Sequence, residues 1–143
     1  KVDGPSHLKV VEEFGYEMYM HCGAIRKVLL AWQTPAFIDE YFKNIILHDQ
    51  AFPHVRPDDL REELKKIRQD GYAITHGEYV TDALGIGAPV FNSDGELAGS
   101  IGIIAPEIRV DTPEFLDTQK DLVQFYASSL SADLGYEKHD VFQ

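Results

Sequence analysis

Six histidines and one cysteine are the side chains of this chain best suited to metal binding or nucleophilic chemistry. His48, Asp49 and His54 fall in one predicted loop, but zinc sites usually show tighter, repeated ligand spacing. We therefore interpret this segment as a solvated loop, with a metal site as the alternative. His21 and Cys22 are neighbours, and neighbours on a strand point to opposite faces, so they form no nucleophile–base pair by themselves. Cys22 is more simply a small buried hydrophobic side chain.

Two other patterns resemble functional motifs without matching them. The segment Gly85-Ile86-Gly87 lacks the third glycine of a dinucleotide-binding loop and runs into a predicted strand, where such a loop would open a helix. Its glycines more simply allow a side chain or a ligand to approach the backbone closely. We interpret the acidic pairs as solvated faces and helix starts, with no catalytic carboxylate pair among them: Glu12-Glu13, Asp58-Asp59 and Glu62-Glu63.

Composition narrows the class of protein. The 143 residues include 13 Lys and Arg against 24 Asp and Glu, a formal net charge of -11, and the length predicts one domain. Because phosphates repel carboxylates, a chain this acidic is a poor candidate for binding DNA or an anionic membrane by itself. No apolar stretch approaches the roughly 20 residues of a membrane span. A single cysteine cannot form an internal disulfide, which fits a reducing compartment, and we expect a cytoplasmic protein.

The first half of the chain predicts a strand followed by two helices. Residues 7–14 are rich in β-prone side chains and end at Gly15, which indicates a strand and a turn. Residues 24–32 carry apolar side chains at the spacing of one helical face. Thr34-Pro35 are residue types favoured at an N-cap and a first helical position, so they predict a second short helix through Phe42.

The later helices have clear start and stop signals. Pro57 opens the strongest of them, and Gly71 follows its last turn, as a left-handed C-cap requires. Residues 72–75 then read as a strand. Thr112-Pro113 open a long final helix that Gly135 ends.

A hairpin between these helices suggests where a ligand would lie. Residues 86–91 and 97–105 flank the turn 92–95, so the chain reads as an α+β domain with a largely antiparallel sheet. Small side chains on one face of the second strand leave a hollow, which is filled either by a bulky helix residue such as Trp32 or by a ligand. The residues of that face are Ala98, Ser100, Gly102 and Ile104.

Taken in order, several segments match one known family. They are Met20–Ala31, Leu60–Arg68 with Gly71-Tyr72-Ala73, Gly87–Phe91, Asp94-Gly95 and Ser131–Gly135. Together they resemble the effector-binding domain of the IclR family of bacterial transcription regulators. The resemblance implies a GAF-like fold, no enzymatic activity, no cofactor and a small-molecule effector. It further implies that residues 1–143 are a single, N-terminally incomplete effector domain, that DNA is bound only by a separate winged helix-turn-helix domain, and that the protein is a homodimer or homotetramer.

The resemblance also implies a set of ligand-binding residues on the first strands, the first helix, the middle strands and the hairpin. They are Val10, Met18, Ala24, Ile25, Thr75, Ala83, Gly85, Gly102 and Ile104. In the family, the positions of Gly102 and Ile104 are often Ser, so we expect an effector larger or less polar than a small keto acid, namely an aromatic or aliphatic compound that carries a carboxylate. We expect its carboxylate on free backbone N–H groups at residues 23–25. Arg26 stands where a Gly is common, which bears on the packing of the first helix.

Three alternatives remain open at this point. The chain could be a metal- or thiol-dependent enzyme that uses Cys22 and nearby histidines. It could be a GAF-like oligomerisation module whose pocket is filled by side chains. Finally, a metal ion could itself be the signal if His21, Cys22 and His76 converge in the fold.

Overall fold

The computed structural model describes residues 1–2, 18–48, 54–109 and 112–138, and its elements follow the predicted order. The strand predicted over residues 7–14 lies outside the described residues. The elements are α1 (Ala24–Ala31), α2 (Pro35–Tyr41), a π-helical turn (Phe42–Ile46), α3 (Pro57–Asp70), β1 (Ala73–His76), β2 (Ala83–Phe91), β3 (Leu97–Pro106), a 3-10 turn (Glu107–Arg109) and α4 (Pro113–Asp133). Within the described ranges, no helix is long and apolar enough to cross a membrane.

The predicted helix ends are confirmed by their capping contacts. The hydroxyls of Thr34 and Thr112 each accept a hydrogen bond from the backbone N–H three residues later, at 3.2 and 3.3 Å. Gly71 ends α3 with a φ of 79° and Gly135 follows α4 with a φ of 87°, left-handed conformations that glycine adopts without steric cost.

The described strands form one antiparallel sheet in the order β1-β2-β3, so the predicted α+β class is confirmed. Ile86 on the central strand faces Ile74 on β1 and Ile103 on β3. The predicted hairpin is present, but β2 begins at Ala83, three residues before its predicted start. The loop 77–82 joins β1 to β2.

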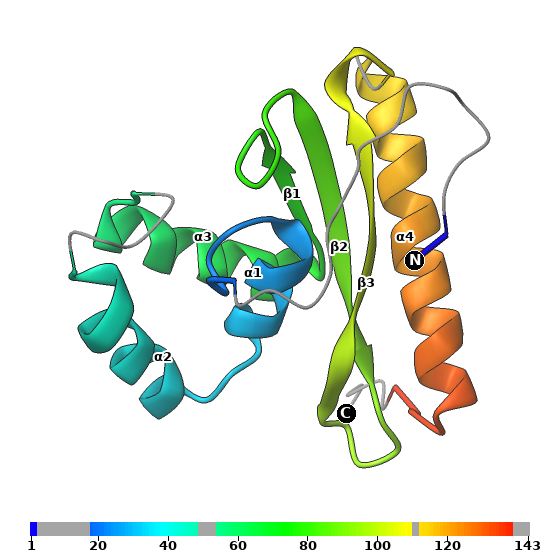
Figure 1. The fold of residues 1–143 in the computed structure, drawn as a ribbon. Coiled ribbons are helices and arrows are strands. Elements are labelled where there is room, and N and C mark those ends of the chain that lie inside the picture. The colour runs from blue at the N-terminus through cyan, green and yellow to red at the C-terminus, as the bar shows by residue number, and fades with distance from the viewer. Residues whose placement is uncertain (3–17, 49–53, 110–111, 139–143) are drawn as a thin grey trace.

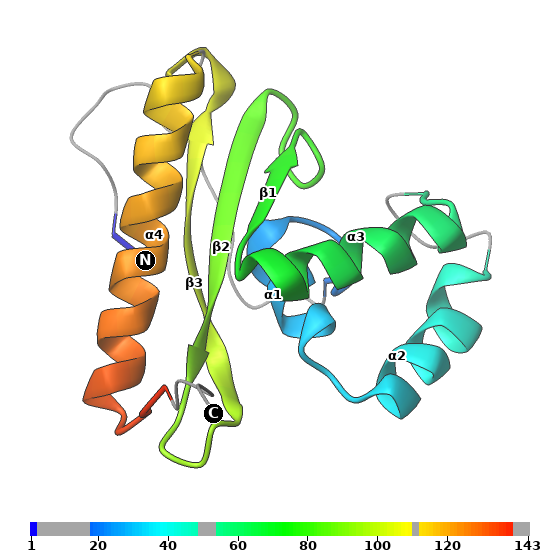
Figure 2. The same ribbon diagram turned by 180° about the vertical axis from the view of Figure 1, so that it is seen from behind.

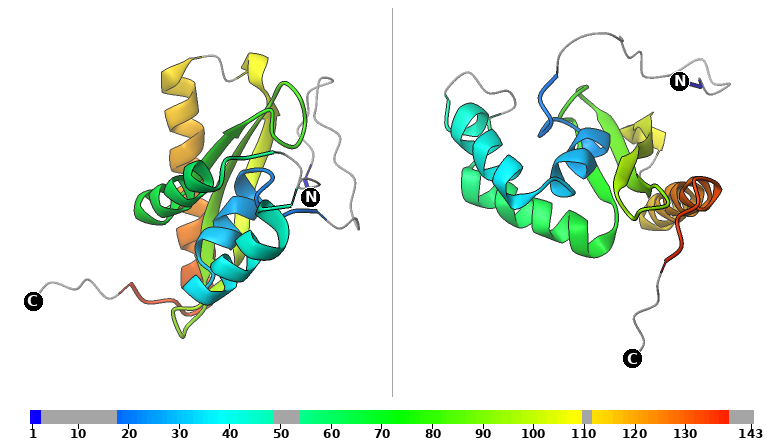
Figure 3. Two further views of the ribbon diagram at one scale, coloured as in Figure 1. Left: turned by 90° about the vertical axis from the view of Figure 1, so that its left-hand side faces the viewer. Right: turned by 90° about the horizontal axis from the view of Figure 1, so that it is seen from below.

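Helices cover both faces of this sheet. Figure 1 and the reverse view in Figure 2 show α4 along one face and α1 on the other, with α3 and α2 beyond α1. The view from below in Figure 3 shows the same three layers. Residues 83–90 of β2 are all buried, as expected for a strand covered on both sides.

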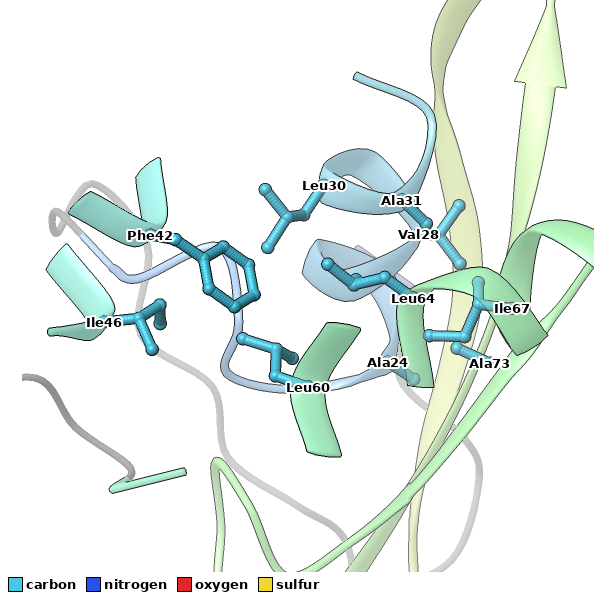
Figure 4. Packing of buried hydrophobic residues seen from close by; sticks show 10 residues of the cluster. All are labelled: Ala24, Val28, Leu30, Ala31, Phe42, Ile46, Leu60, Leu64, Ile67 and Ala73. Atoms are coloured by element: carbon cyan, nitrogen blue, oxygen red, sulfur yellow. The ribbon is translucent and has the colours of Figure 1, made fainter. Parts of the chain in front are cut away.

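Two clusters of buried apolar side chains hold the layers together. On the α4 face, Leu84, Ile86 and Val90 pack with Val123 and Ala127 of the helix. On the other side, a cluster joins α1, α3 and the π-helical turn (Figure 4): Ala24, Val28, Leu30, Ala31, Phe42, Ile46, Leu60, Leu64, Ile67 and Ala73.

Helix α1 lies directly on the backbone of the sheet. A Cβ atom added to Gly87 would be 3.0 Å from the Cα and N atoms of Ile25, and one added to Gly102 would collide with the Ile86 carbonyl oxygen and lie 2.8 Å from Ile25 Cγ1. Ser100 Oγ donates a hydrogen bond to the Ile25 carbonyl at 2.8 Å. Ile25 therefore occupies part of the hollow predicted beside β3, at Gly102. Trp32 instead packs edge-on against Phe91, with ring centroids 6.0 Å apart.

Candidate ligand-binding site

A cavity of about 100 Å³ remains between α1, the sheet and the loop 77–82. The first turn of α1 and its N-cap form one side, the loop forms another, and one residue or more from each strand completes the wall. The lining residues are Gly23, Ala24, Ile25, Arg26, Thr75, Glu78, Tyr79, Val80, Ala83, Gly85 and Ile104.

The structure brings most of the predicted ligand-binding residues to this cavity. Six of them line it: Ala24, Ile25, Thr75, Ala83, Gly85 and Ile104. Gly102 is not among the lining residues, because Ile25 and the backbone of β2 lie against it. Met18 is 39% exposed and is also not on the wall. Val10 lies outside the described residues.

The backbone donors at the start of α1 already have partners within the protein. Gly23 N–H donates to Glu78 Oε2 at 3.0 Å, and Ala24 N–H donates to Thr75 Oγ1 at 3.1 Å. The first N–H groups of a helix have no acceptor inside the helix, so side chains often satisfy them. These two are therefore not the free donors that the sequence led us to expect for a ligand carboxylate.

A buried lysine forms two ion pairs next to the loop, one with Glu63 and one with Glu78. Lys27, the fourth residue of α1, is only 1% exposed. Its Nζ donates to Glu63 Oε1 on α3 at 2.7 Å and to Glu78 Oε1 on the loop at 2.5 Å. Burying an ammonium group is costly unless it is paired, and here two carboxylates pair with it.

Four lining residues were not predicted from the sequence: Arg26, Glu78, Tyr79 and Val80. Gly23 also lines the cavity, and the sequence predicted a role only for its backbone N–H. The guanidinium of Arg26 lies over the Tyr79 ring, 4.5 Å from its centroid, and donates to the Cys22 carbonyl at 3.1 Å. The one signal in the sequence was that Arg26 stands where the family commonly has Gly. We interpreted this difference as a matter of helix packing, whereas Arg26 is a lining residue of the cavity. The loop residues gave no signal, because loops lack the periodicity from which positions are inferred.

Three of the side chains considered for catalysis or metal binding, Cys22, His21 and His76, have other partners, and Asp49 of the predicted loop lies outside the described residues. Cys22 is buried, which raises the pKa of its thiol, and its Sγ lies 3.5 Å from the Glu78 carbonyl oxygen. His21 Nδ1 is 2.8 Å from the Tyr41 hydroxyl, and His76 Nδ1 is 3.0 Å from Glu107 Oε1. In the part of the chain that the structure describes, no three His, Cys, Asp or Glu side chains gather as a metal site.

Two solved structures share this fold over almost all of the chain. The IclR protein of Thermotoga maritima is 27% identical with a TM-score of 0.80, covering 94% of this chain and 55% of that protein. A putative IclR regulator from Silicibacter sp. TM1040 is 23% identical with a TM-score of 0.81, covering 96% and 54%. The latter likeness concerns the fold alone.

Sequence relatives point to the same family. The uncharacterised HTH-type transcriptional regulator RhmR of Escherichia coli K12 is 30% identical over 139 residues, covering 96% of this chain and 53% of RhmR. The probable HTH-type regulator ArcR of Halobacterium salinarum is 30% identical over 121 residues, covering 80% and 44%. The chain thus spans about half the length of these relatives. Both are named as transcriptional regulators, which supports the expectation of a regulator domain over that of an enzyme.

A family model described as the C-terminal region of the bacterial transcriptional regulator IclR matches residues 1–132. The chain belongs to the IclR family, as the C-terminal domain of its members.

Proposed function

We propose that this domain senses a small organic carboxylate with a partly apolar body, which binds in the cavity between α1 and the loop 77–82. The observation that carries the proposal is the convergence of six family-implied positions on one cavity. A cavity with a mainly apolar wall and a few placed polar groups is the usual form of a small-molecule site.

The chemistry of the wall supports this class of ligand. Ile25, Val80, Ala83 and Ile104 offer apolar contacts to a hydrocarbon body. Arg26 also lines the cavity, and its guanidinium lies over the ring of Tyr79, another lining residue. A guanidinium is the side-chain group best suited to a carboxylate. A ligand acid group is therefore expected toward Arg26, because Glu78 and Thr75 already hold the first backbone donors of α1.

The size of the cavity limits the ligand. Pockets for drug-sized molecules typically measure roughly 300–1,000 Å³, whereas this one measures about 100 Å³. A carboxylate of a few carbon atoms fits the structure as it stands. An aromatic acid, which the sequence analysis also favoured, needs the loop 77–82 to move.

The role in the whole regulator follows from linkage. A ligand changes DNA affinity only if it binds two conformations of the protein unequally. We propose that the complete regulator binds DNA through a separate domain in the cytoplasm and is a homodimer or homotetramer in which this domain contributes to assembly.

Isothermal titration calorimetry tests the ligand class. The probes are pyruvate, butyrate and benzoate as sodium salts, with benzamide as the uncharged match of benzoate. We expect a carboxylate to bind, and Ala83→Leu to weaken its binding at least tenfold by filling the cavity. Ala98→Leu is the matched control, since Ala98 is exposed on β3 and is not among the lining residues. Equal binding by both variants would place the site elsewhere, and binding of pyruvate alone would contradict the apolar body.

The chain alone should not bind DNA. Its net charge of -11 repels phosphates, so fluorescence anisotropy with duplex DNA at physiological salt should show no binding. Measurable affinity would overturn the assignment of DNA contact to a separate domain.

A role in oligomerisation without a ligand is the second candidate. The open cavity argues against it, because a pocket packed with side chains would have no free volume. Calorimetry with no binding by any probe, together with a stable oligomer in light scattering, would favour this second candidate.

A further inference from the structure

Glu78 makes several of the polar contacts that hold the loop 77–82 to the body of the domain. Tyr79 also lies under the Arg26 guanidinium, and the Asp82 carbonyl accepts a hydrogen bond from Glu107 N–H at 2.9 Å. Glu78 gives one carboxylate oxygen to Lys27 Nζ and the other to Gly23 N–H, and its carbonyl oxygen lies 3.5 Å from Cys22 Sγ. The next two residues, Tyr79 and Val80, line the cavity directly. Whatever holds Glu78 in place therefore also holds this wall of the cavity.

The loop begins and ends at residues in the left-handed backbone conformation. Gly77 and Asp82 both have positive φ values, 63° and 58°, and Gly77 N–H donates to the Ala83 carbonyl at 2.8 Å. Glycine, and aspartate less readily, adopts this left-handed conformation as a single residue. Residues 78–81 thus form a short loop whose base is closed by a backbone hydrogen bond.

Lys27 carries one positive charge but pairs with two carboxylates. Two carboxylates share a single buried ammonium, so either one alone is enough to neutralise it. If Glu78 were the only partner, opening of the loop would leave an unpaired charge in the interior, which is strongly unfavourable. Because Glu63 is bonded to the same Nζ from α3, the loop can open while Lys27 stays paired.

We propose that residues 77–82 are a lid over the effector cavity, closed by the Glu78–Lys27 ion pair, and that Glu63 is the positioning residue that makes this closure releasable. The assignment of the cavity to an effector rests on the proposed function. Opening of the lid admits ligands larger than the closed cavity. Opening of the lid also changes the contacts of α3, because Lys27 then pairs with Glu63 of α3 and no longer with Glu78.

Amide hydrogen exchange by NMR on the ligand-free chain tests the lid. The reporter is Gly23 N–H, whose acceptor leaves when the lid opens. Glu78→Gln should speed its exchange at least tenfold, because the closing charge is lost. Glu63→Gln should slow it at least threefold, because Lys27 then has no second carboxylate and opening becomes costly. Amides of β2 report global unfolding and serve to normalise the rates.

Glu62→Gln is the matched control, since Glu62 is exposed on α3 next to Glu63 and pairs with Lys65. It should leave Gly23 unchanged. If Glu63→Gln speeds the exchange as Glu78→Gln does, or if neither variant alters it, the lid is overturned. The experiment uses no ligand, so its failure is separate from a failure of the binding screen.

Discussion

The two faces of the sheet are built on different principles. Toward α4, the sheet presents branched side chains, Leu84, Ile86 and Val90, which interlock with Val123 and Ala127. Toward α1, it presents Gly85 and Gly87, and the first turn of the helix rests against their backbone. The same strand β2 supplies both faces, because alternate residues point to opposite sides.

The two faces of the sheet therefore differ in role: the α4 face contributes to stability, and the α1 face holds the candidate binding cavity. The buried cluster between β2 and α4 consists of apolar side chains whose mutual packing stabilises the fold. On the α1 face, the helix touches the sheet at glycines, and the space beyond that contact, at Ala83 and Ile104, is the cavity. The comparison implies that substitutions on the α4 face change the free energy of unfolding without changing ligand affinity.

The largest effect is expected on the α4 face. Ile86 is fully buried, so Ile86→Ala should lower the free energy of unfolding by about 4 kcal/mol, the sum of lost burial and a residual cavity. Urea denaturation measures it, and Ile86→Val, which removes one methyl group, should cost about 1 kcal/mol. A small loss for the alanine variant would show that this face is not the main source of stability.

The next effect tests the contact between α1 and the sheet. Gly102→Ala should destabilise the fold by about 3 kcal/mol, because its Cβ collides with the Ile86 carbonyl oxygen. Gly99→Ala on the same strand is the control: its Cβ meets no atom within 4 Å, so the variant should be neutral or slightly stabilising. Equal denaturation midpoints for the two variants would mean that α1 is not seated closely on the sheet.

A smaller effect on stability is expected at Thr75, whose hydroxyl caps the start of α1 beside the cavity. Thr75 is 6% exposed, and Thr75→Val removes the acceptor of Ala24 N–H while keeping the shape of the side chain. Loss of a capping acceptor costs about 1 kcal/mol. Thr118→Val on the exposed surface of α4 should change the unfolding free energy by less than about 0.5 kcal/mol. Calorimetry should show weaker ligand binding only for the Thr75 variant.

The smallest effect is a dependence on alkaline pH near the start of α1. Burial raises the pKa of Cys22, and also of Tyr41, above their ordinary values. The unfolded chain therefore loses these protons at lower pH than the folded protein does, and stability falls as pH rises above about 9. Cys22→Ala should flatten the first part of this decline in thermal unfolding, and an unchanged slope would place the thiol in a more polar setting.

Local signals allowed the helices and the hairpin to be predicted. Thr34, Gly71 and Gly135 act within one turn of their own position, so their effect can be read from the sequence alone. The α1 face could not be predicted in the same way. Lys27 suggests an exposed position by its type, yet its two partners lie 36 and 51 residues away. Likewise, small residues on β3 signalled free space, but Ile25 of α1 occupies part of it.

The seating of α1 on Gly87 has a mechanical consequence. Side chains between a helix and a sheet act as a compliant layer, because they can change rotamer when one element shifts. At Gly87 that layer is missing, and backbone lies within 3.0 Å of where a Cβ would be. If the N-terminus of α1 moves toward the sheet, no side chain at Gly87 can change rotamer to accommodate the movement. Strand β2 must then move with the helix, and β2 also packs against α4.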